Sequence, residues 1–177
     1  NYSSRGRSQN PQGPFTMNAK YKREVFEDAA KTAHLTLQIG EADLLRKKSA
    51  EVKVGEIKSK KIQTVISKLK RTLLKYRKLT GKGRGIAAVQ IGVPLRICVI
   101  FFDNDLLVII NPKTIRKSKN LFLYPEICMS ANPIIARVAR PEWVEVSYLD
   151  QAGNKQIWHD KKANSGRFDA AQKTWCH

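Results

Sequence analysis

The chain is organised around the stretch Gly83-Arg-Gly-Ile-Ala-Ala-Val-Gln-Ile-Gly92. Its glycines and alanines are small, so a backbone or a ligand can approach the main chain closely at these positions. The side-chain amide of Gln90 follows them and can donate a hydrogen bond into the space that they leave. We therefore predict that this stretch forms one wall of a catalytic cleft, with a basic helix before it and a hydrophobic strand after it.

The spacing Gly83-x-Gly85-x-x-Ala88 also fits the fingerprint of a dinucleotide-binding loop. That fingerprint follows a strand and opens a helix, whereas this stretch is predicted to follow a helix and to precede a strand. The phosphate-binding pattern G-x-x-x-x-G-K-[ST] does not occur in the sequence. These observations argue against a nucleotide-binding protein.

The 177 residues, 42% of them hydrophobic, predict one globular domain with a sizeable core. The net charge of +18 indicates a polyanionic partner such as RNA, or an acidic surface, and most of the excess lies in residues 1–80. No apolar run approaches the ~20 residues that a membrane-spanning helix needs, so we expect no membrane partner. Three cysteines without a C-x-x-C spacing argue against a disulfide framework and for a reducing compartment.

The first 15 residues are polar and basic with little apolar content, which predicts a disordered tail. Like a transit peptide, this tail has basic and hydroxyl residues and no acids, but it has no amphipathic pattern. We expect Met17 to be the true start. Residues 1–19 are assigned to the tail and residues 20–177 to a single catalytic domain. The expected location is the bacterial cytoplasm, or an organelle if the tail is a transit peptide.

The clearest predicted helix covers residues 62–79, and a shorter helix is expected over residues 20–33. Apolar residues recur at helical spacing along one face of the longer helix: Ile62, Val65, Ile66, Leu69, Leu73, Tyr76 and Leu79. Basic residues lie off that face: Lys68, Lys70, Arg71, Lys75, Arg77 and Lys78. Such a basic face is either a solvated surface, the commoner case on amphipathic helices, or a surface that contacts RNA.

Alternating and β-rich runs bounded by turn residues predict strands and hairpins. Two hairpins are expected, with strand, turn and strand at residues 95–102, 103–105 and 106–110, and at residues 143–149, 150–154 and 155–159. Asn111-Pro112 should end the first hairpin, because proline cannot donate to a strand ladder. Before the long helix we expect a short strand from Leu35, a turn at Gly40, an extended segment to Arg46 and a loop over residues 47–59. A loop at residues 160–166 and the opening of a helix at residues 167–177 end the chain.

Cys128 is the most informative of the thiols, since it lies between Glu126 and Ser130 in a segment bounded by two prolines. By itself it is best explained as a half-buried structural cysteine. Cys98 has apolar neighbours, so we expect it to be buried and inert.

Common enzyme patterns are absent from the sequence: it has no G-x-S-x-G elbow, no complete H-E-x-x-H helix and no C-x-x-C knuckle. A nucleophilic cysteine–histidine pair at Cys128 could use only His159 or His177 from the residues that follow. We expect His34 at the surface or in the core, and His159 in solvent.

Taken together, two segments resemble the motifs of the peptide deformylases. The stretch from Gly83 to Gln90 is similar to the first motif, G-Φ-G-Φ-A-A-x-Q, and Glu126-Ile-Cys-Met-Ser130 is similar to the second, E-G-C-L-S. The segments at residues 37–46, 91–97 and 144–156 also resemble the family, so the likeness covers about residues 35–177 in order.

The resemblance implies an α+β fold with antiparallel sheets around a central metal-bearing helix, which is cut short here, and with an N-terminal amphipathic helix. It implies a metal-dependent hydrolase that removes the N-formyl group from the initiator methionine of nascent polypeptides and releases formate. The implied metal is Fe²⁺, with Zn²⁺, Ni²⁺ or Co²⁺ as substitutes. Its implied ligands are Cys128 and His177, the latter matching the first histidine of a third motif, Q-H-E-x-x-H.

The resemblance also implies roles for individual residues. The metal lowers the pKa of a bound water, which becomes the nucleophile. The amide of Gln90 and the backbone N–H of Met129 hold the developing oxyanion. Glu126 orients its neighbours and is not the base. The substrate-binding positions carried over are Gly83, Gly85, Ile86, Glu126 and Ile127.

This chain departs from the family pattern at several points. It stops at His177, before the general-base glutamate and the third metal ligand of the motif. Cys176 stands where the family has glutamine, Ile127 stands where it usually has glycine, and Arg84 occupies a usually hydrophobic position.

We therefore expect a fragment of a deformylase that is inactive as it stands. The alternative is a degenerate, inactive homologue that acts as a basic ribosome- or RNA-associated protein. The expected partners are N-formylmethionyl nascent peptides and, through the basic surface, the ribosome. We expect no DNA partner, and we expect a monomer.

Overall fold

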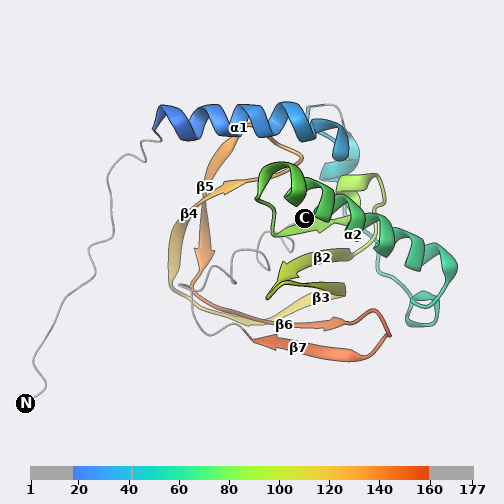
Figure 1. Ribbon diagram of the computed structural model, residues 1–177. Coiled ribbons are helices and arrows are strands. Elements are labelled where there is room, and N and C mark those ends of the chain that lie inside the picture. Colours follow the sequence, from blue (N-terminus) through green and yellow to red (C-terminus); the bar gives the residue numbers. More distant parts are fainter. Residues whose placement is uncertain (1–17, 41, 160–177) are drawn as a thin grey trace, which may run out of the picture.

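The computed structural model describes residues 18–40 and 42–159, and Figure 1 shows their arrangement. Two helices come first, α1 (Ala19–Thr32) and α2 (Lys60–Thr80). Seven strands follow: β1 (Gly85–Ala87), β2 (Ile97–Phe102), β3 (Asp105–Lys117), β4 (Leu121–Ile127), β5 (Ile135–Pro141), β6 (Val144–Leu149) and β7 (Lys155–His159). Short 3₁₀ turns lie at Ala33–Leu35, Asp43–Arg46, Val54–Glu56 and Ala88–Ile91. No helix in this part of the chain is long and apolar enough to cross a membrane.

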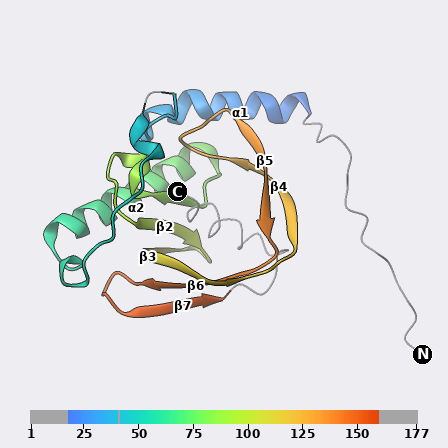
Figure 2. The ribbon, with the colours of Figure 1, turned by 180° about the vertical axis from the view of Figure 1, so that it is seen from behind.

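The strands form two antiparallel sheets. One has five strands in the order β1-β2-β3-β6-β7, and the other is the β4-β5 pair. Figures 1 and 2 show the β4-β5 pair standing to one side of the larger sheet, while α2 lies across β2. The predicted α+β class with antiparallel sheets is confirmed, and the implied metal-bearing helix falls outside the described residues.

Helix α2 forms where the periodicity predicts it. Its start is capped by Ser59, whose hydroxyl accepts a hydrogen bond from Ile62 N, and it ends at Gly81, which has a φ of 67°. Five residues of the predicted apolar face are buried: Ile62, Ile66, Leu69, Leu73 and Tyr76. Val65 is half-buried and Leu79 is exposed, so the buried face is narrower than the sequence pattern indicates.

The central strand β2 divides the apolar residues of the large sheet between two clusters. Val99 and Ile97 pack with α2, whereas Cys98 and Ile100 belong to a second cluster on the opposite face. Successive side chains of a strand point to opposite faces, and both faces of β2 are covered. This explains why its sequence is continuously apolar.

The short strand that we predicted from Leu35 is wrong. Leu35 ends a 3₁₀ turn, and the residues after it run outside both sheets. Their backbone bonds instead to two single positions, with Leu37 N donating to Gln90 O and Ile39 N donating to Ser130 O. The predicted turn at Gly40 is present, but the extended segment to Arg46 is a 3₁₀ turn.

The predicted strand end at Asn111-Pro112 is also wrong, because β3 continues to Lys117. The register of β3 against β6 shifts between Ile110 and Lys113, and this bulge accommodates a residue without an N–H. Asn111 has a φ of 51°, and its side chain accepts from Val52 N at 2.9 Å and donates to Val52 O at 2.7 Å. These two bonds to Val52 replace the β3–β6 ladder bonds that are missing at the bulge.

Both predicted hairpins are confirmed. The turn from β2 to β3 has positive φ at Asp103 and Asn104, as tight hairpin turns require. In the turn from β6 to β7, one oxygen of Asp150 accepts from the backbone N–H groups of Ala152 and Asn154. The predictions for residues 160–177, including the final helix and His177, lie outside the described residues.

Candidate active site

The candidate site forms where three segments meet: residues 36–39, 87–90 and 128–130. The first segment links the other two, because Leu37 N donates to Gln90 O and Ile39 N donates to Ser130 O, each at 2.8 Å. The structure thus brings together the two stretches that the sequence singled out. It also adds a third that the sequence did not identify as part of the site.

Gln90 is 7% exposed and sits at the centre of this junction. Its Oε1 accepts from Ala87 N at 2.8 Å, which turns its NH₂ group toward the second motif. From there Nε2 donates to Ser130 Oγ at 3.1 Å and lies 3.6 Å from Cys128 Sγ. Because the amide oxygen already has a partner, the amide donor is held in one direction.

Two cysteines contrast in environment, as predicted. Cys98 is 2% exposed, and burial raises its pKa to about 12, so it stays a neutral thiol at physiological pH. Cys128 is half-exposed and follows directly after β4, beside the Gln90 amide. Of the two, only Cys128 combines access with neighbouring polar groups.

Met129 lies next to Cys128 and is buried. Its carbonyl oxygen accepts from Thr36 Oγ1 at 3.2 Å and from Gln38 Nε2 at 3.3 Å. Its own N–H has no hydrogen-bond acceptor within the part of the chain that the structure describes. The peptide group that joins Met129 to Ser130 is thus held in place. The N–H of Met129, which belongs to the peptide group that joins it to Cys128, is left as a donor.

Glu126 pairs with Arg140, a residue that our reading of the sequence missed. Arg140 Nε lies 2.7 Å from Oε1 of Glu126, and its Nη2 lies 2.8 Å from Oε2. The two side chains are only 12% and 10% exposed, and the pair joins β4 to β5. A carboxylate on a covered strand needs a cationic partner. This requirement of Glu126 was the one signal in the sequence that could have pointed to Arg140.

The other carried-over positions differ in how accessible they are. Gly83 has a φ of 97°, and a Cβ added there would lie 2.7 Å from Cδ1 of Tyr76, so only glycine fits. Gly85 begins β1, opposite Ile100. The side chain of Ile86 is fully buried. Ile127 is half-buried at the end of β4.

Arg77 of α2 holds the start of the first motif. Its Nη1 donates to Gly83 O at 2.7 Å, and its guanidinium lies 3.4 Å from the ring centroid of Phe101. Phe101 N in turn donates to Arg84 O. The basic helix that precedes the motif therefore positions it directly.

The structure describes one of the two candidate metal ligands. Within residues 18–40 and 42–159, no three His, Cys, Asp or Glu side chains come together in a group that could hold a metal ion. His159 is paired with Glu145 through Nδ1 at 2.8 Å, on the β6–β7 hairpin. Cys128 is the implied ligand that the structure describes, and His177 lies outside the described residues.

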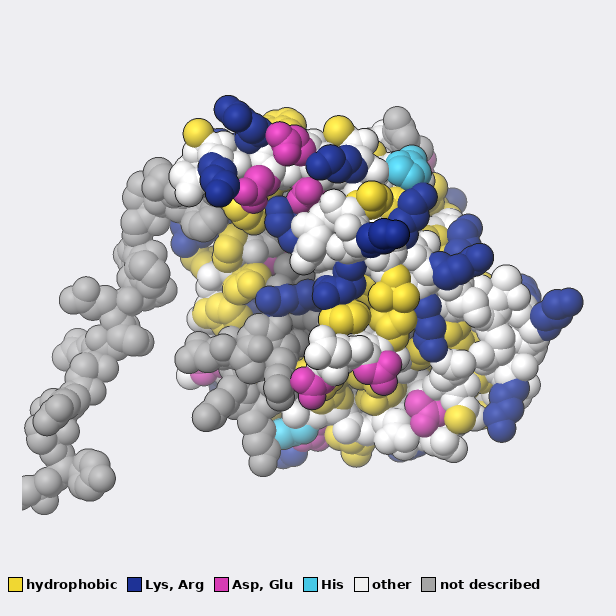
Figure 3. Space-filling view, viewed as in Figure 1, with side chains coloured by type: hydrophobic (Ala, Val, Ile, Leu, Met, Phe, Trp, Pro, Cys, Tyr) yellow, Lys and Arg dark blue, Asp and Glu magenta, His cyan; other side chains and the backbone are white. Residues whose placement is uncertain are grey.

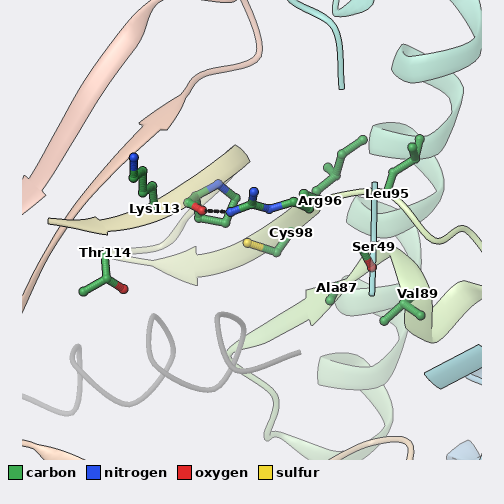
Figure 4. A pocket seen from close by; sticks show the side chains of 10 residues that line it. Ser49, Ala87, Val89, Leu95, Arg96, Cys98, Lys113 and Thr114 are labelled. Atoms are coloured by element: carbon green, nitrogen blue, oxygen red, sulfur yellow. Dashed lines mark hydrogen bonds between the residues drawn. The ribbon is translucent and has the colours of Figure 1, made fainter. Parts of the chain in front are cut away.

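A cavity of about 240 Å³ lies elsewhere, on the face of the sheet that carries Cys98 (Figure 4). Its lining comes from the loop before α2, the first motif and strands β2 and β3: Ser49, Ala87, Val89, Leu95, Arg96, Ile97, Cys98, Pro112, Lys113 and Thr114. Neither Gln90 nor Cys128 lines it. We therefore locate the candidate active site by its chemistry and not by this cavity.

Comparison with known proteins shows the family of this chain. The sequence profile of the polypeptide deformylase family matches residues 35–167, a span that includes both motifs. The chain belongs to this family.

Relatives and solved structures support the assignment. The chain is 40% identical over 79 residues to a peptide deformylase of Rhizobium meliloti, which covers 42% of this chain and 45% of that protein. It is 36% identical over 116 residues to one of Finegoldia magna, covering 64% and 66%. The chain thus spans about half to two thirds of the length of these curated relatives.

Two crystal structures share the fold. A class I type b peptide deformylase from Acinetobacter baumannii has a TM-score of 0.67 at 24% identity, covering 77% of this chain and 87% of that one. A peptide deformylase from Legionella pneumophila also has a TM-score of 0.67, at 27% identity, covering 78% and 76%.

Proposed function

We propose that this chain carries the catalytic site of a peptide deformylase, which hydrolyses the N-formyl group from the initiator methionine of nascent polypeptides and releases formate. One observation carries the proposal: the Gln90 amide nitrogen lies 3.6 Å from the Cys128 thiol, and the next residue, Met129, has an N–H without an acceptor among the described residues. Hydrolysis of an amide needs donors aimed at the oxygen that gains negative charge, and this site holds two of them.

The family depends on a metal ion, and Cys128 fits one place in its ligand set. Its thiol is half-exposed and free of a disulfide, and a thiolate is a ligand that iron and zinc both accept. We propose Fe²⁺, or Zn²⁺, Ni²⁺ or Co²⁺ in its place, held by Cys128 and by His177. When bound, such an ion supplies a water of lowered pKa for attack on the formyl carbon.

The protein's own groups then have distinct tasks. Gln90 Nε2 and Met129 N–H are placed to hold the formyl oxygen, and the bond from Ala87 N keeps the Gln90 amide aimed before substrate arrives. Both carboxylate oxygens of Glu126 are engaged by Arg140. Glu126 therefore supports the β4–β5 pair and is not placed as the general base.

We also propose where and how the protein works. Its substrates are N-formylmethionyl nascent peptides, lying against the backbone of Gly83, Gly85, Ile86, Glu126 and Ile127. It acts as a monomer associated with the ribosome, in the bacterial cytoplasm or in an organelle. The net charge of +18 supports association with a partner rich in nucleic acid.

The first test is formate release from an N-formylmethionyl tripeptide by the full-length protein loaded with Fe²⁺ without oxygen, or with Ni²⁺. Cys128→Ala should abolish both metal content and formate release, because it removes a ligand. Cys98→Ala is the matched control, since Cys98 is the same residue type buried in strand β2 of the large sheet, and it should keep both. Full activity in Cys128→Ala would contradict the proposal.

The same assay tests the alternative of an inactive, basic binding protein. That alternative predicts no formate release from the metal-loaded protein, together with salt-sensitive RNA binding that Cys128→Ala leaves unchanged.

A further inference from the structure

Helix α2 carries eight Lys and Arg residues and no Asp or Glu. Six of them are exposed on the side opposite its buried apolar face, and we call these six the basic ridge: Lys60, Lys61, Lys68, Arg71, Lys75 and Lys78. Figure 3 shows Lys and Arg side chains gathered along the area that α2 occupies, with acidic side chains over α1 and toward the lower part of the view.

The ridge residues differ from the two other cations of the helix. Lys70 donates to Gln151 Oε1 at 2.8 Å, and Arg77 binds Gly83 O and Phe101, so both have partners within the protein. Across the described ranges, no ridge residue has a carboxylate within salt-bridge distance.

Nearby acids are already engaged with other cations. Asp28 lies 2.7 Å from Lys82, and Glu51 lies 2.5 Å from Arg96. Among the residues that the structure describes, the positive charge of the ridge is therefore left without a paired carboxylate.

The ridge is unfavourable for the helix by itself. Lys68 and Arg71, and then Arg71 and Lys75, stand three and four residues apart, where like charges repel across one turn. Lys60 and Lys61 lie in the first turn, where the helix dipole favours acids, and that turn has none. A bound polyanion would relieve both kinds of repulsion.

The shape of the ridge suits an extended polyanion. From Lys60 to Lys78 the helix rises ~27 Å at ~1.5 Å per residue. Neighbouring ridge charges one turn apart lie closer than the Debye length of ~8 Å in physiological salt, so their potentials add. A membrane surface fits less well, because a helix that binds a bilayer inserts its apolar face, and that face of α2 is buried in the core.

We propose that the basic ridge of α2 docks on the phosphate backbone of RNA. The choice of RNA rests on the proposed function, since a protein that acts on nascent chains works beside ribosomal RNA. Docking through α2 leaves the candidate site free, because the ridge points away from the side of the helix that contacts the first motif.

The test is binding of a fluorescent RNA 20-mer to the full-length protein, measured by anisotropy at several salt concentrations. The triple variant Lys68→Gln, Arg71→Gln and Lys75→Gln should bind at least tenfold more weakly. Each phosphate contact contributes about 0.7 to the steepness of log K against log salt, so the loss of three contacts should make that slope shallower by about 2. The matched control removes the same charges from α1, where the acids Glu24, Glu27 and Asp28 follow the cations, through Lys20→Gln, Lys22→Gln and Arg23→Gln. It should bind within about twofold of wild type.

Two outcomes would overturn the proposal: equal loss of RNA binding in both triple variants, or wild-type binding to phosphatidylserine vesicles without binding to RNA. Formate release is measured on the same samples and should be equal in wild type and ridge variant. If no sample releases formate while the ridge variant loses RNA binding, the proposed catalytic function fails and RNA docking at the ridge stands.

Discussion

Gln90 shows how a single side chain joins two distant motifs. Its backbone carbonyl, amide oxygen and amide nitrogen each bond to a different residue: Leu37, Ala87 and Ser130. The two bonds of the side-chain amide, to Ala87 and Ser130, limit its direction, so its donor faces the Cys128 side without reorganisation. This is the arrangement that stabilises developing charge most effectively in a covered site.

Gln90→Glu tests that role directly. The substitution keeps an oxygen for Ala87 N but replaces the NH₂ donor with a second acceptor, so kcat for formate release should fall by about 10²- to 10³-fold. Metal content should stay unchanged. A kcat within twofold of wild type would show that the amide donor is not used.

Thr36 acts on the site through Met129, whose carbonyl accepts its hydroxyl. Thr36→Val removes the hydroxyl at almost constant volume and leaves that carbonyl with Gln38 alone. The free energy of unfolding in urea should fall by about 0.5–1.5 kcal/mol. We also expect kcat to fall with KM unchanged, because the Met129 peptide loses one of its two restraints.

Thr36→Ser is the control for this change, since it restores the donor and should recover both stability and kcat. Recovery of stability without kcat would show that the clamp on Met129 is structural only.

At the scale of elements, the β4–β5 pair holds the second motif and depends on a covered ion pair. The strands form a sheet of two, so neither can draw ladder bonds from a third strand among the described elements. Glu126 and Arg140 add a two-point bond between them, close to Cys128. A pair this well covered is costly to break, because the remaining charge has no partner.

Arg140→Met should therefore lower the free energy of unfolding by about 3–5 kcal/mol, since it leaves the Glu126 carboxylate covered and unpaired. Chemical denaturation measures the loss. The double variant Glu126→Leu with Arg140→Met removes both charges and should recover most of it. A double variant no more stable than the single one would show that packing of the Arg140 stem, and not charge pairing, holds the strands.

At the scale of the whole molecule, the site lies between the large sheet with α2 and the β4–β5 pair, with residues 36–39 joining them. Helix α1 precedes the span that matches the family, yet it is tied to the first motif. Lys82, the residue before Gly83, lies 2.7 Å from Asp28 and 3.8 Å from Glu24 of α1. Lys82, which follows α2, therefore ties α1 to the start of the first motif, and Arg77 of α2 supports the same motif through Gly83.

Several elements could be predicted because their signals are local. The face of α2 follows from apolar spacing, and the two hairpins follow from alternation interrupted by Asp, Asn and Gly. The contrast between Cys98 and Cys128 also followed from their neighbours in the chain. Predictions failed at Leu35 and at Asn111-Pro112 because the hydrogen bonds there go to residues far along the chain, and the extended segment predicted up to Arg46 is a 3₁₀ turn.

The sequence by itself determined the helices, the hairpins and the two motifs with Gln90 and Cys128, because each depends on residues within a few turns or strand repeats of one another. Only the tertiary structure decided that Thr36 and Gln38 hold Met129, that Arg140 pairs with Glu126, and that Arg77 supports Gly83. The Thr36–Met129 bond joins residues 93 positions apart. No periodicity records such a contact, since it exists only once the packed core has brought the two segments together.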